Sequence, residues 1–539
     1  MARMTGGEAI VDGLLRHGID TVFGLPGVQT YGLFDAFARN ANRLRLINAR
    51  HEQTTAYMAL GYACATGRPS AFAVVPGPGV LNTTAALATA WGLNAPVLCL
   101  TGQVPSALIG RGRGQLHELP DQLATLRTLL KYADRIEHPS QASYLVARAF
   151  QEMLSGRRGP VALEMPWDQF PATTDVTPQD PLPLQPAPVP DTEKVAALAK
   201  LLDAARAPMI WVGGGAQNAS AEILALAERI GAPVVSFRSG RGIVDDDHPL
   251  SMTIASAYRL WKDTDLLIGF GTRLETPVMR WGGLPAGLKT ARIDIDPAEM
   301  RRLKVDIGIV ADASDAARAL AALVAPRKDA GRAAAIAQAK KEITVAIRKL
   351  QPQMSFLDAI REVLPSNGIF CDEMTQVGYV SWFGFPVHFP RGLITSGFSG
   401  TLGAGFPMAL GVKVAHPDRP VVAVTGDGGF LFGGSELATA VLHGINLVTV
   451  VFNNSSYGNV LRDQRRLFDG RDSGAALRNP DFVAYARSFG VAAWHAKDAA
   501  GLKTALAEAL AANAPALIEV KTDITQEPAP WEFLAPNRE

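Results

Sequence analysis

Two polar residues that could bind a metal ion, Asp427 and Asn454, each follow a short apolar run of the sequence. Residues 421–424 precede the first, and residues 447–452 precede the second. Runs of this kind are typical of buried parallel strands. If the two strands are neighbours, about 4.8 Å apart, both side chains face one small volume beyond the carboxyl ends of the strands. Carboxylate and amide oxygens are hard ligands that suit Mg²⁺.

The segment between the two runs favours a phosphate site beside the metal. Residues 435–443 predict a helix with Ser435 as its N-cap, and Gly428 and Gly429 would let the backbone approach a phosphate closely. A single Gly-Asp-Gly is usually only a turn, and Asn-Asn is usually a loop. Gly-Asp-Gly followed about 25 residues later by Asn-Asn, each closing an apolar strand, is far more specific.

A further carboxylate, Glu52, lies between a predicted strand at residues 44–49 and a predicted helix at residues 53–65. Taken alone, a Glu at a helix start is most often a solvated partner of the helix dipole. The surrounding sequence, ARHEQTTAYMALGYACATGRP, resembles the segment of the thiamine diphosphate (ThDP) enzymes whose Glu contacts N1′ of the aminopyrimidine. The glycine run SGFSGTLGAGFP at residues 396–407 and the Gly-Asp-Gly and Asn-Asn pair extend the resemblance, which is to acetolactate-synthase-like members.

The resemblance implies a set of cofactor residues. Mg²⁺ would be held by the Asp427 carboxylate, the Asn454 side chain and the Ser456 carbonyl. Leu402 occupies the position of the large apolar residue that wedges between the cofactor rings and forces a bent conformer. The full set of implied contacts to ThDP comprises Pro26, Gly27, Gly77, Gly400, Leu402, Gly426, Asp427, Gly428, Gly429, Asn454, Ser456 and Tyr457.

The same resemblance gives Glu52 a chemical task. The C2 proton of the thiazolium ring is weakly acidic, and a carboxylate on N1′ favours the imino tautomer of the pyrimidine. N4′ then becomes a base held next to C2, so that acid–base catalysis is relayed through the cofactor.

His117 is the candidate on the substrate side. Acetolactate-synthase-like enzymes carry Phe-Gln-Glu where this chain has Leu116-His117-Glu118. His117 could donate a proton or contact a carbonyl, and an ordinary structural histidine is an equally good interpretation. The nearby Arg111 and Arg113 could bind a substrate carboxylate, although loop arginines are usually only solvated.

Composition excludes several other classes of protein. The chain of 539 residues has a net charge of +1 and 19% charged residues, so it does not have the charge of a nucleic-acid-binding protein. Its three cysteines lie far apart and suit a reducing cytoplasm. The N-terminus lacks a signal-peptide pattern, and no apolar run is long enough to predict a membrane span.

The order of helical and strand patterns predicts an α/β fold with three doubly wound parallel-sheet domains. We expect a pyrimidine-binding domain at residues 1–170, a central domain at 192–325 and a diphosphate-binding domain at 353–525. A linker at 171–191, with six prolines between 177 and 190, and a linker helix at 326–352 would join them. The tail, 526–539, predicts an ordered strap. The first and third domains share a pattern of strand, glycine turn and helix, which suggests two related halves.

The central domain bears on a second cofactor. Gly213-Gly214-Gly215-Ala216 is not the Gly-x-Gly-x-x-Gly of a nicotinamide site. Gly271-Thr272-Arg273-Leu274-Glu275-Thr276 only partly resembles the FAD-binding motif of acetolactate synthases. FAD is therefore possible but less favoured than its absence.

The resemblance implies a ThDP- and Mg²⁺-dependent lyase or transferase. It would decarboxylate a 2-oxo acid, ligate the remaining fragment to a second carbonyl, or both. The alternatives are a 2-hydroxyacyl-CoA lyase or a benzoylformate-decarboxylase-type enzyme without flavin, and, of another class, a non-catalytic or flavin electron-transfer relative. Each site is expected to form between two subunits, with Glu52 from one and Asp427 and Asn454 from the other. The protein is then at least a homodimer, and commonly a homotetramer.

Overall fold

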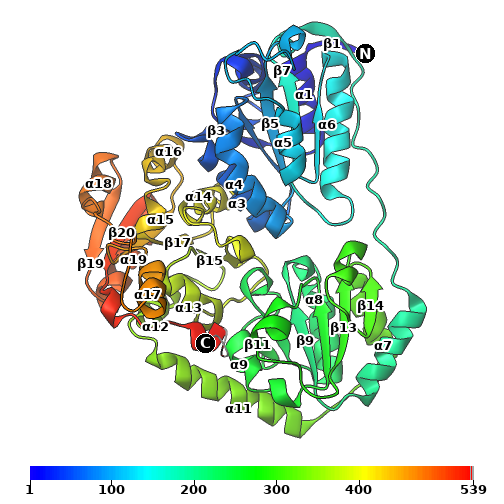
Figure 1. The fold of residues 1–539 in the computed structure, drawn as a ribbon, viewed down its shortest axis with the longest axis vertical. Coiled ribbons are helices and arrows are strands. Elements are labelled where there is room, and N and C mark those ends of the chain that lie inside the picture. The colour runs from blue at the N-terminus through cyan, green and yellow to red at the C-terminus, as the bar shows by residue number, and fades with distance from the viewer. Residues whose placement is uncertain (535, 537–539) are drawn as a thin grey trace.

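A computed structural model describes residues 1–534 and 536 as three α/β domains arranged around a common centre (Figure 1). Each domain has one six-stranded sheet in which every pair of neighbouring strands is parallel. The central strands of each sheet are buried, because helices cover both faces, and this explains their continuous apolar sequences. Several strands at the sheet edges are partly exposed. The predicted fold class is confirmed.

The first domain has the sheet order β3-β2-β4-β5-β7-β6. Numbered within the domain, this order is 2-1-3-4-6-5. Its strands are β2 (Thr21–Gly24), β3 (Arg45–Asn48), β4 (Ser70–Val74), β5 (Val97–Gln103), β6 (Tyr132–Arg135) and β7 (Val161–Pro166). Its helices are α1 (Gly6–Arg16), α2 (Tyr31–Arg39), α3 (Glu52–Thr66), α4 (Pro78–Leu93), α5 (Gln122–Leu129) and α6 (Pro139–Leu154).

The third domain has the order β16-β15-β17-β18-β20-β19, which is again 2-1-3-4-6-5. Its strands are β15 (Ile369–Cys371), β16 (Leu393–Ile394), β17 (Val421–Gly426), β18 (Val448–Asn453), β19 (Ala492–Ala496) and β20 (Ala516–Lys521). Its helices are α12 (Gln353–Val363), α13 (Gln376–Gly384), α14 (Gly405–Ala415), α15 (Asp427–Phe430), α16 (Leu437–His443), α17 (Gly458–Leu467), α18 (Phe482–Ser488), α19 (Ala499–Ala512) and α20 (Trp531–Leu534). The shared order agrees with the prediction of two related halves.

The middle domain differs, because its order β11-β10-β9-β12-β13-β14 is 3-2-1-4-5-6, the arrangement of dinucleotide-binding folds. Its strands are β9 (Pro208–Val212), β10 (Val234–Ser236), β11 (Ser251–Thr253), β12 (Leu266–Phe270), β13 (Lys289–Asp294) and β14 (Ile307–Val310). Its helices are α7 (Thr192–Ala204), α8 (Ser220–Ile230), α9 (Ile254–Tyr258) and α10 (Ala313–Leu323), and α11 (Ala330–Ala346) leads to the third domain.

Three local features differ from the sequence expectations. The predicted linker contains a strand, β8 (Thr173–Val176), which pairs antiparallel with β1 (Ala2–Thr5) and ties the N-terminus to the first domain. The prediction of Ser435 as a helix N-cap is wrong. Ser435 lies inside a 3₁₀ turn, η10 (Gly434–Glu436), that precedes α16, and the Ser435 side chain caps neither element. Asp427 does not simply end a strand but opens the short helix α15.

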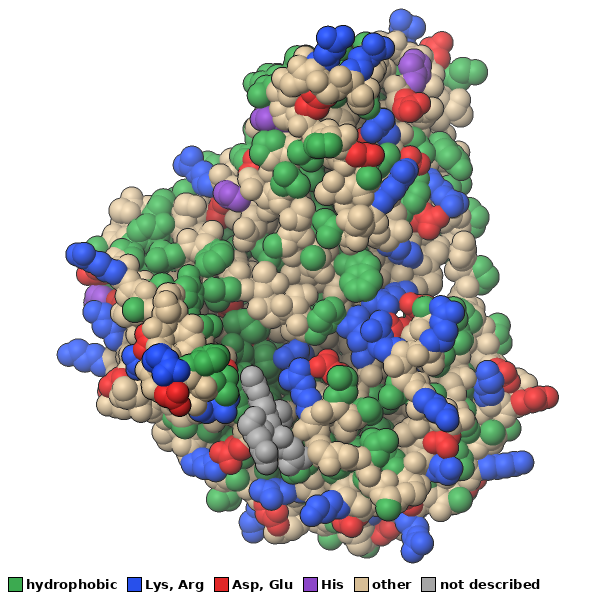
Figure 2. Space-filling view, viewed as in Figure 1, with side chains coloured by type: hydrophobic (Ala, Val, Ile, Leu, Met, Phe, Trp, Pro, Cys, Tyr) green, Lys and Arg blue, Asp and Glu red, His purple; other side chains and the backbone are tan. Residues whose placement is uncertain are grey.

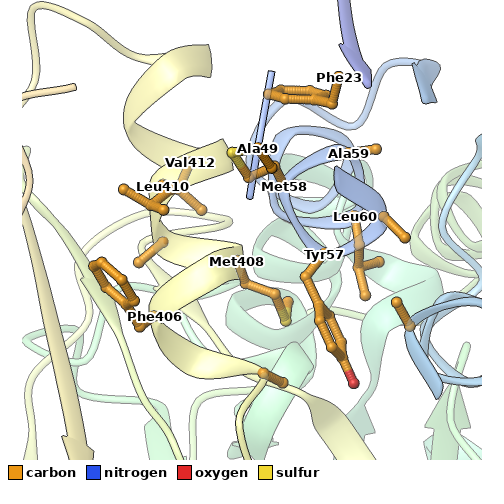
Figure 3. Close-up of a cluster of buried hydrophobic side chains, with 14 of the residues drawn as sticks. Phe23, Ala49, Tyr57, Met58, Ala59, Leu60, Phe406, Met408, Leu410 and Val412 are labelled. Atoms are coloured by element: carbon orange, nitrogen blue, oxygen red, sulfur yellow. The ribbon is translucent and has the colours of Figure 1, made fainter. Parts of the chain in front are cut away.

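The first and third domains meet through α3 and α14 (Figure 3). Each helix follows the second strand of its domain. A Cβ atom on Gly61 would overlap the Met408 carbonyl oxygen, and one on Gly411 would overlap the Met58 carbonyl oxygen. These reciprocal contacts make the crossing approximately two-fold symmetric. Residues 54–61 of α3 are all buried, as expected of a helix that lies between its own sheet and a second helix.

The crossing predicts that Gly411→Ala destabilises the protein. The new methyl group must displace backbone, which should cost about 3 kcal/mol, the upper end of overpacking penalties, and lower the thermal unfolding midpoint. Gly501→Ala is the matched control, since its Cβ would lie 3.4 Å from the nearest atom, Asp498 Oδ1. That change should be neutral or stabilise by up to about 1 kcal/mol through helix propensity. Equal midpoints for the two variants would contradict this description of the crossing.

Candidate active site

Asp427 lies at the edge where β17 and β18 end together. The two strands are hydrogen-bonded neighbours with Gly426 opposite Phe452, which meets the condition set in the sequence analysis. The Asp427 side chain is buried, and its Oδ2 accepts a 2.6 Å hydrogen bond from Asn479 Nδ2. Burial raises the pKa of Asp427, while the Asn479 amide and backbone N–H groups oppose that shift. A bound cation would favour the charged carboxylate.

Asn454 and Ser456 flank Ser455, whose backbone N–H is directed at the Asp427 carboxylate. Asn454 Oδ1 accepts from Ser456 N at 3.1 Å and from Ser456 Oγ at 2.9 Å. The amide nitrogen donates to Glu527 Oε2 at 3.1 Å. A carboxylate, an amide oxygen and a nearby backbone carbonyl form the oxygen-only donor set that Mg²⁺ accepts, so the residues present fit the implied metal.

Asn479 is a site residue that the sequence did not reveal. Its Nδ2 bridges Asp427 Oδ2 and Asn453 Oδ1, the latter at 2.9 Å. Asn453 in turn donates to the buried Glu519 Oε1 at 2.7 Å. This chain of hydrogen bonds fixes the orientation of the predicted metal carboxylate. In the sequence Asn479 resembles any loop residue before a helix, and only the fold brings it to Asp427.

The glycines beside Asp427 are required by packing. A Cβ on Gly428 would lie 2.6 Å from Tyr457 Cε1, and one on Gly429 would overlap the Glu373 carboxyl group. Their contact with a phosphate stays a prediction. The N-terminus of α13 lies at the same edge, because a Cβ on Gly426 would be 3.7 Å from Thr375 Cβ, and free N–H groups at a helix start suit a phosphate.

Glu373 connects the loop that contains Leu402 to β17, the strand that ends just before Asp427. Its carboxyl group accepts hydrogen bonds from Gly403 N and Thr425 Oγ1. Burial raises the pKa of Glu373 to about 7, although both hydrogen bonds oppose the shift. On the other side of the loop, Thr401 Oγ1 lies 3.0 Å from Thr89 Oγ1 of the first domain. Half-buried Leu402 is therefore carried by a segment that is fixed at both ends.

Glu52 belongs to a second group, at the carboxyl edge of the first sheet. It is the first residue of α3, is half-buried, and its Oε2 accepts from Asn82 Nδ2 at 3.0 Å. A Cβ on Gly79 would lie 3.7 Å from Glu52 Cγ. Val75 fills the space between Gly79 and Gly27, so the turns after β2 and β4 pack together beside Glu52.

His117 lies over the same turns. Its carbonyl oxygen would overlap a Cβ on Gly77, whose N–H donates to Gln122 Oε1 at 2.8 Å. The His117 backbone has a φ of 63°, which is uncommon for a residue other than glycine, and its buried Nδ1 has no hydrogen-bond partner among the described residues. Strained, unsatisfied residues of this kind cluster at functional sites.

The structure thus arranges the predicted residues as two half-sites. Pro26, Gly27, Gly77, His117 and Glu52 gather on the first domain. Gly400, Leu402, Gly426–Gly429, Asn454, Ser456 and Tyr457 gather on the third. In the described part of the chain, Glu52 and Asp427 share no hydrogen-bond partner, and α3 meets the third domain through α14 and β16.

A separate cavity of about 560 Å³ opens at the junction of the three domains. It follows the carboxyl ends of β9 and β12, where the strand order of the middle domain reverses. Its lining includes Arg157, Arg238, Arg273 and Arg391, and Figure 2 shows Lys and Arg side chains gathered in this region. Arg238 stacks on the Trp382 ring at 4.4 Å, and burial lowers the pKa of its guanidinium group. Such a cavity suits an anionic ligand.

The comparisons with known proteins agree with this geometry. Three family models match successive parts of the chain: the N-terminal TPP binding domain of thiamine pyrophosphate enzymes at 4–125, their central domain at 195–320 and their C-terminal TPP binding domain at 374–520. The chain therefore belongs to the thiamine pyrophosphate enzymes. The predicted family and its cofactor, ThDP, are confirmed.

Curated relatives match over nearly the whole chain. A Pseudomonas aeruginosa protein named "probable 2-ketoarginine decarboxylase" is 33% identical over 530 residues, which cover 96% of this chain and 94% of its own. A "probable acetolactate synthase large subunit" of Methanocaldococcus jannaschii is 34% identical over 554 residues, covering 96% and 92%. An "acetolactate synthase" of Arthrospira platensis is 31% identical over 568 residues, covering 100% and 97%. Among the described residues, no helix is both long and apolar enough to cross a membrane.

The hydrogen bonds of Asn479 predict that Asn479→Leu weakens the metal site. The change removes the donor that holds Asp427 and leaves two buried acceptors without it, so Mg²⁺-dependent binding of ThDP should weaken about tenfold to a hundredfold. Titration of the cofactor-free protein with ThDP at several Mg²⁺ concentrations measures the effect. Asn446→Leu, which removes a half-buried side chain whose amide donates to Asn513 Oδ1, is the control. Unchanged Mg²⁺ dependence in the Asn479 variant would contradict its role.

Proposed function

We propose that this protein decarboxylates a 2-oxo acid with ThDP and Mg²⁺, and that it ligates the remaining fragment to a second carbonyl when an acceptor is present. The observation that carries this proposal is the coexistence of a positioned carboxylate, Glu52, with the oxygen cluster of Asp427, Asn454 and Ser456. A non-catalytic relative has no need of both. We place the enzyme in the cytoplasm, consistent with its free cysteines.

Each group of residues has a separate task in this proposal. Bound ThDP supplies a carbon nucleophile at C2 and accepts the electrons released when CO₂ leaves. Glu52 holds the proton at N1′ of the pyrimidine, and Asn82 orients the Glu52 carboxylate. Leu402 shapes the cofactor from the opposite half-site, and His117 faces the substrate as a donor to its carbonyl oxygen.

Asp427, Asn454 and the Ser456 carbonyl would hold Mg²⁺ against the diphosphate. Glu527 fixes the amide of Asn454 from the C-terminal tail. That tail packs on the third domain through Trp531, which lies 5.2 Å from the Tyr379 ring. The tail thereby acts as a strap over the metal side of the site; residues 535 and 537–539 of the predicted strap lie outside the described residues.

We further propose that a complete site needs two chains. Large apolar side chains are exposed around both half-sites: Val28, Tyr31, Leu81 and Leu116 around the first, and Phe398, Leu431 and Phe432 around the second. Juxtaposing the first half-site of one chain with the second half-site of another would bury these side chains and bring Glu52 to the cofactor. The result is a homodimer with two sites, which could pair further into a homotetramer.

The names of the relatives suggest which substrates to test first. Pyruvate and 2-ketoarginine are the first 2-oxo acids to test, and benzoylformate and 2-hydroxyacyl-CoA substrates separate the alternative lyases. The arginine-lined cavity at the junction of the three domains keeps the flavin alternative open. A purified protein with flavin absorbance near 450 nm would favour an FAD-containing enzyme, and a colourless one would favour catalysis with ThDP alone.

The direct test of the proposed function is CO₂ release from this substrate panel. The purified protein should release CO₂ from at least one 2-oxo acid, only when ThDP and Mg²⁺ are both present. Release without ThDP, or C–C cleavage confined to 2-hydroxyacyl-CoA substrates, would contradict the preferred reaction.

Glu52→Gln should abolish the activation of the cofactor while leaving it bound. The amide cannot hold the N1′ proton as the carboxylate does, so C2 proton exchange of bound ThDP should fall by at least about a hundredfold, within the range of acid–base contributions. Rapid-quench NMR measures this exchange. Glu193→Gln, which changes an acidic residue in the first turn of α7, is the control. Wild-type exchange in the Glu52 variant would reject its assignment.

A further inference from the structure

Glu436, in the third domain, contacts the connection between β3 and α3 in the first. Its side chain is fully buried between the two domains of one chain. The carboxylate accepts hydrogen bonds from Arg50 N, at 3.0 and 3.1 Å to its two oxygens, and from His51 N at 3.0 Å. Thr439 Oγ1 also donates to it. Both oxygens of the buried carboxylate are therefore paired with hydrogen-bond donors.

These bonds hold the backbone immediately before Glu52. His51 is the N-cap of α3, and Glu52 is the first residue of that helix. A second residue of the third domain supports the same connection, since His443 Nε2 lies 3.2 Å from Asn48 N and 2.8 Å from Asn48 Oδ1. The position and direction of the Glu52 side chain therefore depend on Glu436 in η10 and His443 in α16 of the same chain.

Glu436 is also tied to the metal side of its own chain. It closes η10, which follows α15, the short helix that Asp427 opens. Gly434 of η10 packs against Phe430 of α15, because a Cβ on Gly434 would lie 3.3 Å from the Phe430 ring. The metal side of its own chain is therefore the alternative place at which Glu436 could act.

We propose that Glu436 is a positioning residue that sets Glu52 in place from the third domain of the same chain. This inference rests on the proposed function, in which Glu52 and Asp427 of one chain serve different sites. Glu436 then connects the diphosphate half of one site to the catalytic acid of the other.

Glu436→Gln tests the positioning role, because the new amide N–H₂ would face other donors. Amide hydrogen exchange of residues 48–53 should accelerate in the cofactor-free protein. C2 proton exchange of bound ThDP should fall about tenfold to a hundredfold, the cost of a small misplacement, while Mg²⁺-dependent ThDP affinity stays unchanged. Thr439→Val removes a single donor to Glu436 and should give a smaller decrease. If Glu436→Gln does not fold, Glu436→Asp keeps the charge with a shorter side chain and should show the same decrease.

Glu436 could act on Glu52 of its own chain or on the metal half-site of its own chain. Paired mutations in mixed dimers distinguish these two possibilities. When Glu52→Gln and Glu436→Gln are on the same chain beside a wild-type chain, about half of the activity should remain, because one of two symmetric sites is intact. When they are on opposite chains, both sites should be impaired. The reverse pattern would show that Glu436 serves the metal half-site of its own chain, and would overturn the proposal.

The outcome for the proposed function can be read separately. A wild-type protein without ThDP-dependent activity, or an active Glu52→Gln variant, removes the proposed function and the Glu436 inference with it. If those controls behave as expected but Glu436→Gln keeps wild-type C2 exchange, the positioning role alone is wrong.

Discussion

The close crossing of α3 and α14 is the constraint on which the rest of the structure depends. Gly61 and Gly411 let the two helices approach until each glycine touches the opposite backbone. Glu52 opens α3 and Leu402 lies just before α14, so the crossing fixes where these two segments leave the core. These contacts are reciprocal, and the first and third domains have the same strand order, so the two domains are related by an approximate two-fold axis. The first and third domains each present one cluster of candidate site residues at the carboxyl edge of their sheet.

Much of this architecture could be predicted from the sequence. The predicted strands at residues 44–49, 421–424 and 447–452 correspond to β3, β17 and β18, and each observed boundary lies within two residues of the predicted one. The β1–β8 pair could not be predicted, because Ala2–Thr5 and Thr173–Val176 are short and partly polar and gain stability only from each other. Strands of two or three residues, such as β16 and β10, are too short to show a period.

Candidate site residues stand out in the sequence where they belong to a motif, and not where they contribute only by hydrogen bonds that position other residues. Asp427, Asn454 and Glu52 stand in patterns with specific spacing. Asn479 and Glu436 do not, because their importance lies in hydrogen bonds to residues far away in the chain. The sequence drew attention to Gly428 and Gly429 but not to the reason they are glycines. The side chains that leave no room for a Cβ there, Tyr457 and Glu373, are identified only by the structure.

The central claim is that Glu52 of one chain and Asp427 of another complete each site. Mixing Glu52→Gln chains with Asp427→Ala chains, each inactive alone, tests it most directly. In each mixed dimer one site has both mutations and the other has none, so random reassociation should restore about a quarter of wild-type activity. No recovery, with mixed dimers demonstrated by mass spectrometry, would mean that both residues act within a single chain and would contradict this account.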